Sequence, residues 1–437
     1  MSIQKSFEKF LSRCVAKALR REHPFIIGVA GSVGKSSTKT AIGIALGALE
    51  DGSKVVMSDK NYNNDLGVPL AVFGCVMPGR SIVKWSVLLG KAALTALGIL
   101  KLRAKTFVLE MGTDRPGDLL RLVKMAKPNI GVLTAIGPEH TEYFGGVDEV
   151  AKEEAFIFST LTEGDTAIVN ADDDRALEIA KSFKANVYSF GTSDQAWVRI
   201  VSTELIAEEN NPEHSGLLVE LFMSGETITI KLEKTAGKPQ AYAAAAALAC
   251  AAAMGKDLTQ AAARLEKHFC GMPGRMRLLE GIKHTWLLDD SYNSSPLAVM
   301  SAIRDLSVFP INESAKRIAV LGDMLELGSL AEQSHVDMGR AVAEAGIDLL
   351  VLCGGMSGVV ARAAKEAGMS DEAIFIYQNS SEAGLFVQER MKRGDVILIK
   401  GSQGIRMERV TKELMAHPDR VAELLVRYTP DWLRRTG

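Results

Sequence analysis

The stretch GVAGSVGKSSTK, residues 28–39, follows the apolar run PFII and leads into the helix-prone segment TAIGIALGAL. A short strand, a glycine turn and a helix that opens with Gly-Lys-Ser together form a cradle for nucleotide phosphates. Gly31 and Gly34 let backbone N–H groups approach phosphate oxygens, Lys35 neutralises the outer phosphates, and the Ser36 hydroxyl is the expected magnesium ligand. The strict motif spacing requires a glycine where this chain has Val29. Because strand, turn and helix all occur in order, the pattern favours a nucleotide site over a bare glycine turn.

The composition is that of a soluble globular protein with more than one domain. With 437 residues, 47% hydrophobic and 24% charged, the chain is long enough for two or three domains. A net charge of −2 gives no reason to expect nucleic-acid binding. The five cysteines are scattered, as expected in a reducing cytoplasm, and no His-x-x-x-His pair is present, so oxygen atoms are the expected metal ligands. The N-terminus has an amphipathic helical pattern and no signal-peptide pattern, which favours a cytoplasmic location.

Short apolar runs that end in Gly, Asp or Asn alternate with helical segments, which predicts an α/β fold with a doubly wound parallel sheet. Alternating residues around SGE near 217–233 predict a small antiparallel hairpin. The segment GMPGRMR, residues 271–277, is typical of a hinge, and a second, Rossmann-like strand–helix series follows it. We therefore expect three parts: an N-terminal helical segment 1–24, a central ATP-binding domain 25–272 and a C-terminal domain 273–437.

The apolar stretch at residues 81–100 predicts a helix packed on the domain, although a membrane-surface contact is a second interpretation. Lys84 and Lys91 argue against a membrane span, because a charge near the bilayer centre is costly. The expected buried face consists of the apolar residues at helical spacing, namely Trp85, Leu88, Leu89, Ala92, Ala96 and Ile99.

Several further residues at the expected ends of strands could contribute to a site, but each has an ordinary structural explanation when taken alone. Glu110 ends the run TFVLE, where a carboxylate can complete a magnesium site, and His140 follows another strand as a loop residue. Asn63 and Asn64 could bind polar substrate groups or form a turn. The acidic motifs at 289–296 and 322–328 could instead cap helices, and the glycine turn at 399–404 could bind an anion or be a bare turn.

Taken in chain order, these motifs resemble the central and C-terminal domains of the Mur ligases. The ordered series is Gly-Ser-x-Gly-Lys-Ser, Asn-x-Asn-Asn-x-x-Gly-x-Pro, Leu-Glu-Met-Gly, Glu-His and Asn-Ala-Asp-Asp. The motifs DDSYNSSP, LGDMLELG and IKGSQGIRMERV resemble the C-terminal domain of the branch that adds D-alanyl-D-alanine to muramoyl peptides in peptidoglycan biosynthesis. The resemblance covers about residues 25–425.

The resemblance implies a magnesium-dependent ligase that uses ATP to convert a carboxylate into an acyl phosphate, which an amine then displaces. It implies catalytic roles for Lys35, His140, Glu154 and Arg275, and metal ligation by Ser36, Glu110, His140 and Glu154. The implied nucleotide-binding residues are Gly31, Ser32, Gly34, Lys35, Ser36, Ser37, Gln240, Arg275 and Asp290. The implied substrate-binding residues are Asn63, Asn64, Asn293, Asp323, Glu326, Lys400 and Ser402. Closure of the second domain at the hinge 271–275 is implied as well.

The chain departs from the family pattern at three places. Glu154 occupies the position of a carbamylated lysine; a glutamate already carries the negative oxygen ligand that a carbamate gives to lysine, but its side chain is shorter. Pro239-Gln240 replaces a His-Asn pair beside the adenine. Only about 27 residues precede Gly28, too few for the family's UDP-binding domain. We therefore expect that UDP recognition is lost, rebuilt or supplied by a partner, or that the carboxyl substrate is a different one.

The prediction is therefore an ATP- and magnesium-dependent amide ligase, most like the D-alanyl-D-alanine-adding branch. Two alternatives remain open. One is a ligase with the same mechanism and another substrate pair, including folate-like polyglutamylation. The other is a regulatory protein that binds ATP but has lost ligation. The carboxylate and amine substrates are expected to be small molecules, with no nucleic-acid partner.

Overall fold

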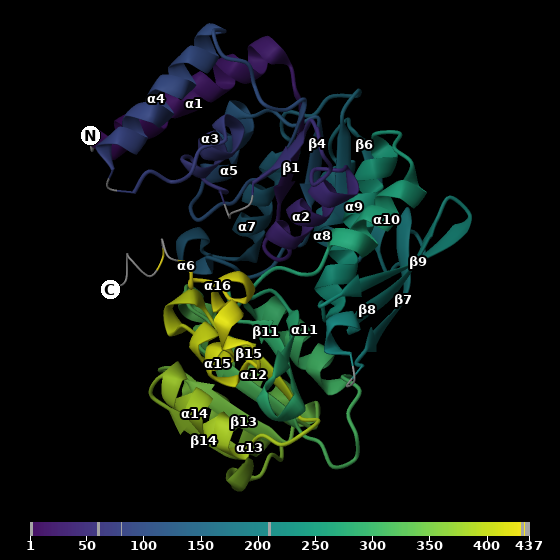
Figure 1. Ribbon diagram of the computed structural model, residues 1–437, viewed down its shortest axis with the longest axis vertical. Helices are drawn as coiled ribbons and strands as arrows, with labels where there is room; N and C mark the ends of the chain where they lie inside the picture. Colours follow the sequence, from purple (N-terminus) through teal and green to yellow (C-terminus); the bar gives the residue numbers. More distant parts are fainter. Residues whose placement is uncertain (1–2, 59–61, 80, 209–210, 430–431, 433–437) are drawn as a thin grey trace. The chain divides into compact units, whose positions relative to one another are not determined.

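The computed structural model describes residues 3–58, 62–79, 81–208, 211–429 and 432 (Figure 1). The chain divides into two compact units, the first formed by residues 1–201, 220–228 and 242–269 and the second by 202–219, 229–241 and 270–437. The second unit therefore begins its continuous part at Cys270, and it also takes two segments from the antiparallel region that precedes it.

A nine-stranded sheet has the order β2-β3-β1-β4-β5-β6-β7-β8-β9. Its strands are β1 (Phe25–Ala30), β2 (Val55–Met57), β3 (Thr106–Glu110), β4 (Ile130–Leu133), β5 (Thr166–Asn170), β6 (Asn186–Gly191), β7 (Val198–Ile206), β8 (Gly216–Met223) and β9 (Glu226–Glu233). The pairs from β2 to β7 are parallel. β8 and β9 are joined by Ser224 and Gly225, both at positive φ (53° and 86°), which is the backbone of a tight hairpin turn. The α/β fold class predicted from the sequence is confirmed.

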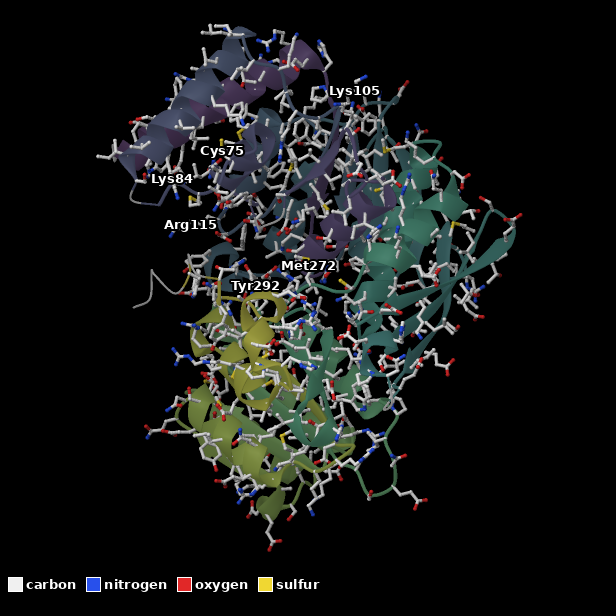
Figure 2. All side chains as sticks on the ribbon, in the orientation of Figure 1. Cys75, Lys84, Lys105, Arg115, Met272 and Tyr292 are labelled. Carbon is white, nitrogen blue, oxygen red and sulfur yellow. The ribbon has the colours of Figure 1, made fainter. Side chains whose placement is uncertain are left out.

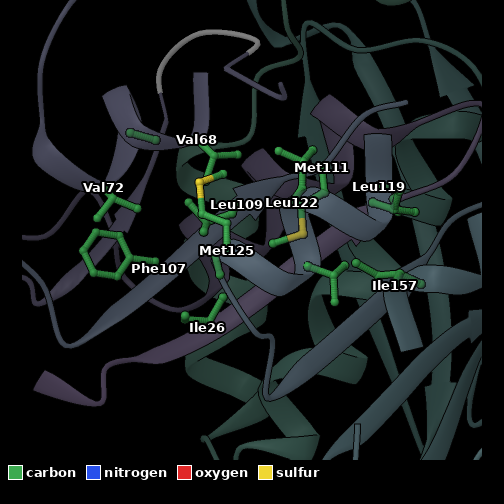
Figure 3. Close-up of a cluster of buried hydrophobic side chains, with 14 of the residues drawn as sticks. Ile26, Val68, Val72, Phe107, Leu109, Met111, Leu119, Leu122, Met125 and Ile157 are labelled. Carbon is green, nitrogen blue, oxygen red and sulfur yellow. The ribbon is translucent and has the colours of Figure 1, made fainter. Parts of the chain in front are cut away.

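The central strands of this sheet are buried on both faces, as expected when helices cover both sides of a parallel sheet. The apolar side chains of Phe107 and Leu109 in β3, and of Met111 directly after it, belong to the same core cluster as Leu119, Leu122 and Met125 (Figure 3). The accompanying helices are α1 (Ile3–Glu22), α2 (Lys35–Ala45), α3 (Gly67–Phe73), α4 (Ile82–Leu97), α5 (Asp118–Met125), α6 (Thr141–Phe144), α7 (Val147–Glu154), α8 (Asp174–Lys181), α9 (Lys238–Ala253) and α10 (Leu258–His268).

Helices α1 and α4 lie side by side and run in the same direction (Figure 1). Phe7 stacks on Trp85 near their N-termini, with ring centroids 5.3 Å apart. At the other end the Arg21 guanidinium donates to the carbonyl oxygens of Thr95 (2.8 Å) and Ala96 (3.2 Å), where a cation stabilises a helix C-terminus. Among the described helices, none combines the length and hydropathy of a membrane-spanning segment.

The buried face of α4 corresponds to the predicted one except at its end. Leu88, Ala92 and Ala96 are buried, whereas Ile99 is 68% exposed. Gly98 adopts a left-handed conformation (φ 89°) and ends the helix, so Ile99 leaves the helical register on which the prediction depended.

The second unit contains a six-stranded sheet of order β10-β11-β15-β12-β13-β14. Its strands are β10 (Arg277–Gly281), β11 (Thr285–Asp290), β12 (Arg317–Gly322), β13 (Leu349–Cys353), β14 (Ile374–Tyr377) and β15 (Val396–Lys400). Only the pairing of β10 with β11 is antiparallel. The helices are α11 (Pro296–Ser307), α12 (Ala331–Glu344), α13 (Ser357–Glu366), α14 (Ser380–Arg390), α15 (Glu408–Leu414) and α16 (Val421–Leu424).

Candidate nucleotide and ligase site

The loop between β1 and α2 is held close to the sheet by its neighbours. Gly31 has φ 122°, and a Cβ atom there would lie 2.3 Å from the Thr134 hydroxyl oxygen, so only glycine fits without displacing this contact. The same hydroxyl donates to the carbonyl oxygen of Val33 (2.6 Å). The loop therefore has a fixed backbone, although the strict glycine spacing is missing.

The N-terminus of α2 is open to an anion. Gly34, its N-cap residue, adopts a left-handed conformation (φ 89°), no side chain caps the helix, and its first turn contains no acidic residue. The first N–H groups of a helix have no partner within the helix and carry partial positive charge. This N-terminus, with Lys35 and Ser36 as the first helical residues, provides the geometry that phosphate groups require.

The ammonium group of Lys35 lies inside the loop, where it donates to the carbonyl oxygens of Gly31 and Ser32. Its Nζ is 3.2 Å from Oε2 of Glu139. Burial by itself lowers the pKa of Lys35, but the nearby carboxylates of Glu139, Glu154 and Glu110 raise the pKa above its ordinary value. Lys35 therefore stays positively charged at the point where outer phosphates are expected.

Glu154 ends α7, and its buried carboxylate contacts the same loop: Oε2 accepts the N–H of Gly31 at 2.8 Å. Burial raises the pKa of Glu154 to about 7, against the opposing effects of Lys35 and of the Gly31 N–H group. The loop thus already binds one anionic group through its backbone, and this group titrates near neutral pH.

We expect Glu154→Gln to change how the stability of the nucleotide-free protein depends on pH. The folded-state pKa is above the ordinary 4.5, so the stability that Glu154 contributes is fully present below pH 4.5 and is lost as pH rises through about 7. The neutral glutamine can still accept the Gly31 N–H and has no such loss. Between pH 5 and pH 8, urea unfolding should therefore show the free energy of unfolding of the wild-type protein falling by about 2.5 kcal/mol more than that of the variant. A difference that is equal at both pH values would contradict the assignment.

Oxygen atoms suited to a cation lie near the start of α2. The Ser36 hydroxyl and Oε2 of Glu110 are both buried without a hydrogen-bond partner. The register of β1 and β3 pairs Glu110 with Val29, directly before the loop. Asn63 donates from Nδ2 to Oε1 of Glu110 (3.2 Å), and the buried Lys39 ammonium is 3.9 Å from Oε2. Buried hard oxygen atoms that lack a hydrogen bond fit a magnesium ion.

The other predicted metal ligand, His140, has a different neighbour. It adopts a left-handed backbone (φ 53°) at the start of α6, and its Nε2 lies 3.5 Å from Oδ1 of Asp114. Within the part of the chain that the structure describes, no three His, Cys, Asp or Glu side chains converge as a metal-binding cluster. Glu110, His140 and Glu154 are thus not gathered into one ligand set here.

The two predicted asparagines make local contacts. Oδ1 of Asn64 accepts the N–H groups of Leu66 (3.2 Å) and Gly67 (2.9 Å), which fixes the turn into α3. Asn61 of the same motif lies outside the described residues. A cavity of about 390 Å³ lies beside Asn63 and Asn64, and its further lining includes Glu8, Asp65, Asp114 and Asp118.

In the second unit, the predicted residues gather at the carboxyl ends of the strands. Lys400, 2% exposed, donates to Oδ2 of Asp290 (2.6 Å) and to the carbonyl oxygen of Asn293 (3.0 Å). The Asp323 carboxylate accepts the N–H groups of Gly355 and Met356. Ser402 accepts the N–H of Leu325 (2.9 Å) through its hydroxyl. Glu326 is exposed, with φ 63°.

Arg275 and Gln240 lie close together. Nε2 of Gln240 donates to the carbonyl oxygen of Arg275 (2.7 Å), while Oε1 of Gln240 is buried without a partner. The Arg275 guanidinium stacks on the ring of Tyr292, labelled in Figure 2, at 4.4 Å from its centroid. Gln240 therefore offers an unused acceptor, and Arg275 is held by its aromatic neighbour.

Sequence reasoning missed several charged residues at these sites. Glu139 pairs with Lys35, Lys39 with Glu110, and the fully buried Asp289 accepts the N–H of Gly274 (2.9 Å). Lys39 could have been noticed, because it is a second lysine of the same helix, one turn after Lys35. The partners of Glu139 and Asp289 depend on tertiary contacts that have no local sequence signal.

Comparisons with known proteins agree with this fold. Residues 91–251 match the family model of the Mur ligase middle domain, and residues 274–403 match that of the Mur ligase glutamate ligase domain. These two matches together cover more than half of the chain. The chain belongs to the Mur ligase family.

Within this family, the chain is similar to ligases of one activity. It is 29% identical to the UDP-N-acetylmuramoyl-tripeptide–D-alanyl-D-alanine ligase of Bacillus subtilis, over 90% of this chain and 76% of the relative. The enzyme of that name from Escherichia coli is 26% identical over 89% and 76% of the two chains. The crystal structure of MurF from Acinetobacter baumannii superposes with a TM-score of 0.73 at 25% identity, covering 92% of this chain and 79% of the other.

Proposed function

We propose that this chain is an ATP-dependent ligase that joins a carboxylate and an amine in an amide bond, with a muramoyl peptide and D-alanyl-D-alanine as the substrates. The observation that carries the proposal is the loop at residues 31–36, where an open helix N-terminus and a charged, enclosed Lys35 lie beside Glu110 and Glu154. The substrates are those in the names of the relatives from B. subtilis and E. coli.

In this mechanism the substrate carboxylate attacks the γ-phosphorus of ATP and ADP leaves. The amine then attacks the acyl phosphate and phosphate leaves. Lys35 and the backbone N–H groups of Gly34 and Ser36 bind and orient the phosphates, so that the charge that develops on the transferred group is stabilised. Binding of phosphate requires Lys35 to exchange its contact with Glu139 for phosphate oxygens.

In the second unit, we propose Arg275, Gln240 and Asp290 as nucleotide-binding residues. The unpartnered Oε1 of Gln240 can accept the exocyclic amine of adenine, and the ion pair with Lys400 fixes the Asp290 carboxylate. Asn293, Asp323, Glu326, Lys400 and Ser402 remain the proposed residues for the amine substrate. Lys400 and Asp323 are already engaged within the protein, so we assign them to positioning the loops that contact this substrate.

A magnesium ion would be held by Ser36 and Glu110, with His140 and Glu154 proposed for a second ion; these ions neutralise phosphate charge. The test is Ser36→Ala, which removes a hydroxyl that has no partner in the folded protein. Calorimetric titration with a non-hydrolysable ATP analogue should need about tenfold more magnesium for half-maximal binding, with the unfolding midpoint unchanged. Ser357→Ala, which removes another buried unpartnered hydroxyl, is the matched control. Equal magnesium dependence in all three proteins would remove Ser36 from the site.

The proposal is tested by measuring ADP release together with product mass. ATP, magnesium, UDP-muramoyl-tripeptide and D-alanyl-D-alanine are supplied together and with each substrate omitted in turn. We expect ADP release to require both substrates and the product to have the mass of the pentapeptide conjugate. ADP release that ignores both substrates would contradict ligation.

A second candidate is a regulatory protein that binds ATP without ligation. The observation that favours it is the contact between Glu154 and the Gly31 N–H, because a carboxylate then occupies a backbone donor of the phosphate loop. This candidate predicts ATP binding without a product for any substrate pair. A Mur-type ligase with other substrates predicts ADP release only with another carboxylate and amine. The same assay, repeated with other carboxylate and amine pairs, therefore distinguishes the proposed ligase, a ligase with other substrates and the regulatory protein.

A further inference from the structure

Helix α4 exposes a continuous apolar stripe. Val83, Val87, Leu94 and Leu97 recur at the three- and four-residue spacing of one helical face, with Gly90 between them. Val83, Val87 and Leu97 are 61–73% exposed, and Ile82 at the first turn is 81% exposed. The opposite face, with Leu88, Ala92 and Ala96, belongs to the domain core. The stripe is therefore a second apolar face, and none of the residues that the structure describes covers it.

The neighbouring helix α1 exposes basic side chains. Lys9, Arg13, Lys17 and Arg20 recur along one exposed face, and Lys5 and Arg21 extend it at both ends. The helix contains only two acidic residues, Glu8 and Glu22. Its opposite face, with Leu11, Val15 and Leu19, is buried in the core. In a chain whose net charge is only −2, this is a strong local excess of positive charge.

The two exposed faces are adjacent. α1 packs along α4, and both helices also pack on α3, so the buried sides of both point into the same core. Phe10, 41% exposed, adds an aromatic side chain to the α1 part of the surface. Lys84, labelled in Figure 2, carries a positive charge at the N-terminal end of the α4 stripe, and α4 has no acidic residue. The apolar stripe of α4 and the basic row of α1 together form a surface that we call the α1–α4 face.

We propose that the α1–α4 face binds the surface of an anionic phospholipid bilayer, with the apolar stripe of α4 inserted at the boundary between the headgroups and the acyl chains and the basic row of α1 in contact with the phosphates. Helices that combine an exposed apolar face with clustered Lys and Arg lie in the plane of such interfaces. Charge decides the occupant: a second copy of this chain would bring the same basic row against itself, whereas an anionic lipid surface complements it. This proposal does not depend on ligase activity.

The experiment is co-sedimentation of the full chain with large unilamellar vesicles. One set contains phosphatidylcholine with about 30% phosphatidylglycerol, which makes the surface anionic, and the other contains phosphatidylcholine alone. We expect binding to the anionic vesicles at least tenfold stronger than to the neutral ones, and weaker binding as salt is raised. Val87→Ser with Leu94→Ser, and separately Arg13→Glu with Lys17→Glu, should each lower the partition coefficient at least tenfold.

Matched control pairs change similar side chains elsewhere on the surface. Val308→Ser with Leu385→Ser removes two other exposed apolar side chains, and Lys181→Glu with Lys184→Glu reverses two other exposed charges. Both controls should bind like the wild-type protein.

Absence of binding to anionic vesicles overturns the proposal, and so does equal loss in the control pairs. Binding that survives Val87→Ser with Leu94→Ser overturns insertion of α4. If the protein does not bind vesicles but forms a dimer in light scattering, and Val87→Ser with Leu94→Ser dissociates this dimer, the α1–α4 face is a self-association surface instead.

Discussion

Replacing Lys35 by methionine is expected to lower kcat/KM for ATP-dependent ligation by about 10³-fold, equivalent to roughly 4 kcal/mol of transition-state stabilisation. The ammonium group is enclosed by the loop, and the surrounding carboxylates keep it charged. Among the described residues, Lys35 is the cation that contacts these loop carbonyls, and methionine fills a similar volume without its charge. The phosphoryl group would then lose its nearest positive charge, and Glu139 would face it unopposed.

The measurement is steady-state ADP release with both substrates, accompanied by calorimetric binding of an ATP analogue. Lys105→Met, an exposed lysine of the same unit, is the control and should keep wild-type kinetics. Lys35→Arg should recover little, because the larger planar guanidinium does not fit a pocket shaped by the carbonyl oxygens of Gly31 and Ser32. A variant Lys35→Met that retains more than a tenth of wild-type kcat/KM would show that the loop does not position the reacting phosphate.

Much of the fold could be predicted because its signals are local. The runs FIIGVA and TFVLE are apolar and end where polar loop residues begin, and such runs form the interior strands of parallel sheets. Gly31 and Gly34 mark the loop because only glycine adopts their backbone conformations with little strain. The buried face of α4 follows helical spacing up to Gly98, which ends the helix. Periodicity alone does not indicate where a helix ends, so the exposure of Ile99 could not be predicted from it.

The electrostatics of the candidate site could not be predicted in this way. Glu154 was identified by its position in a motif, but that position does not show that its carboxylate accepts the Gly31 N–H, which comes from a segment 123 positions away. The contact of Glu139 with Lys35 depends on the loop after β4 lying beside the loop after β1. Helical spacing likewise predicted a packed face for α4 but could not identify α1 as its neighbour, because pairing of distant helices depends on tertiary structure.

Lys39 shows how strongly such a hidden contact can matter for stability. Its side chain is fully buried, with Nζ 3.9 Å from Oε2 of Glu110 and 2.7 Å from the carbonyl oxygen of Ser58. We expect Lys39→Met to lower the free energy of unfolding by about 3 kcal/mol, because Glu110 would stay buried without its opposite charge. Methionine has a similar length, so little of the loss would come from a cavity.

Urea unfolding of Lys39→Met, Glu110→Gln and the double variant measures this interaction directly. If Lys39 stabilises the protein through Glu110, the double variant should lose less than the sum of the single losses by at least about 1 kcal/mol. Additive losses would mean that Lys39 acts through Ser58 instead. The result also bears on function, because Lys39 is the buried cation beside the Glu110 carboxylate that we propose as a magnesium ligand.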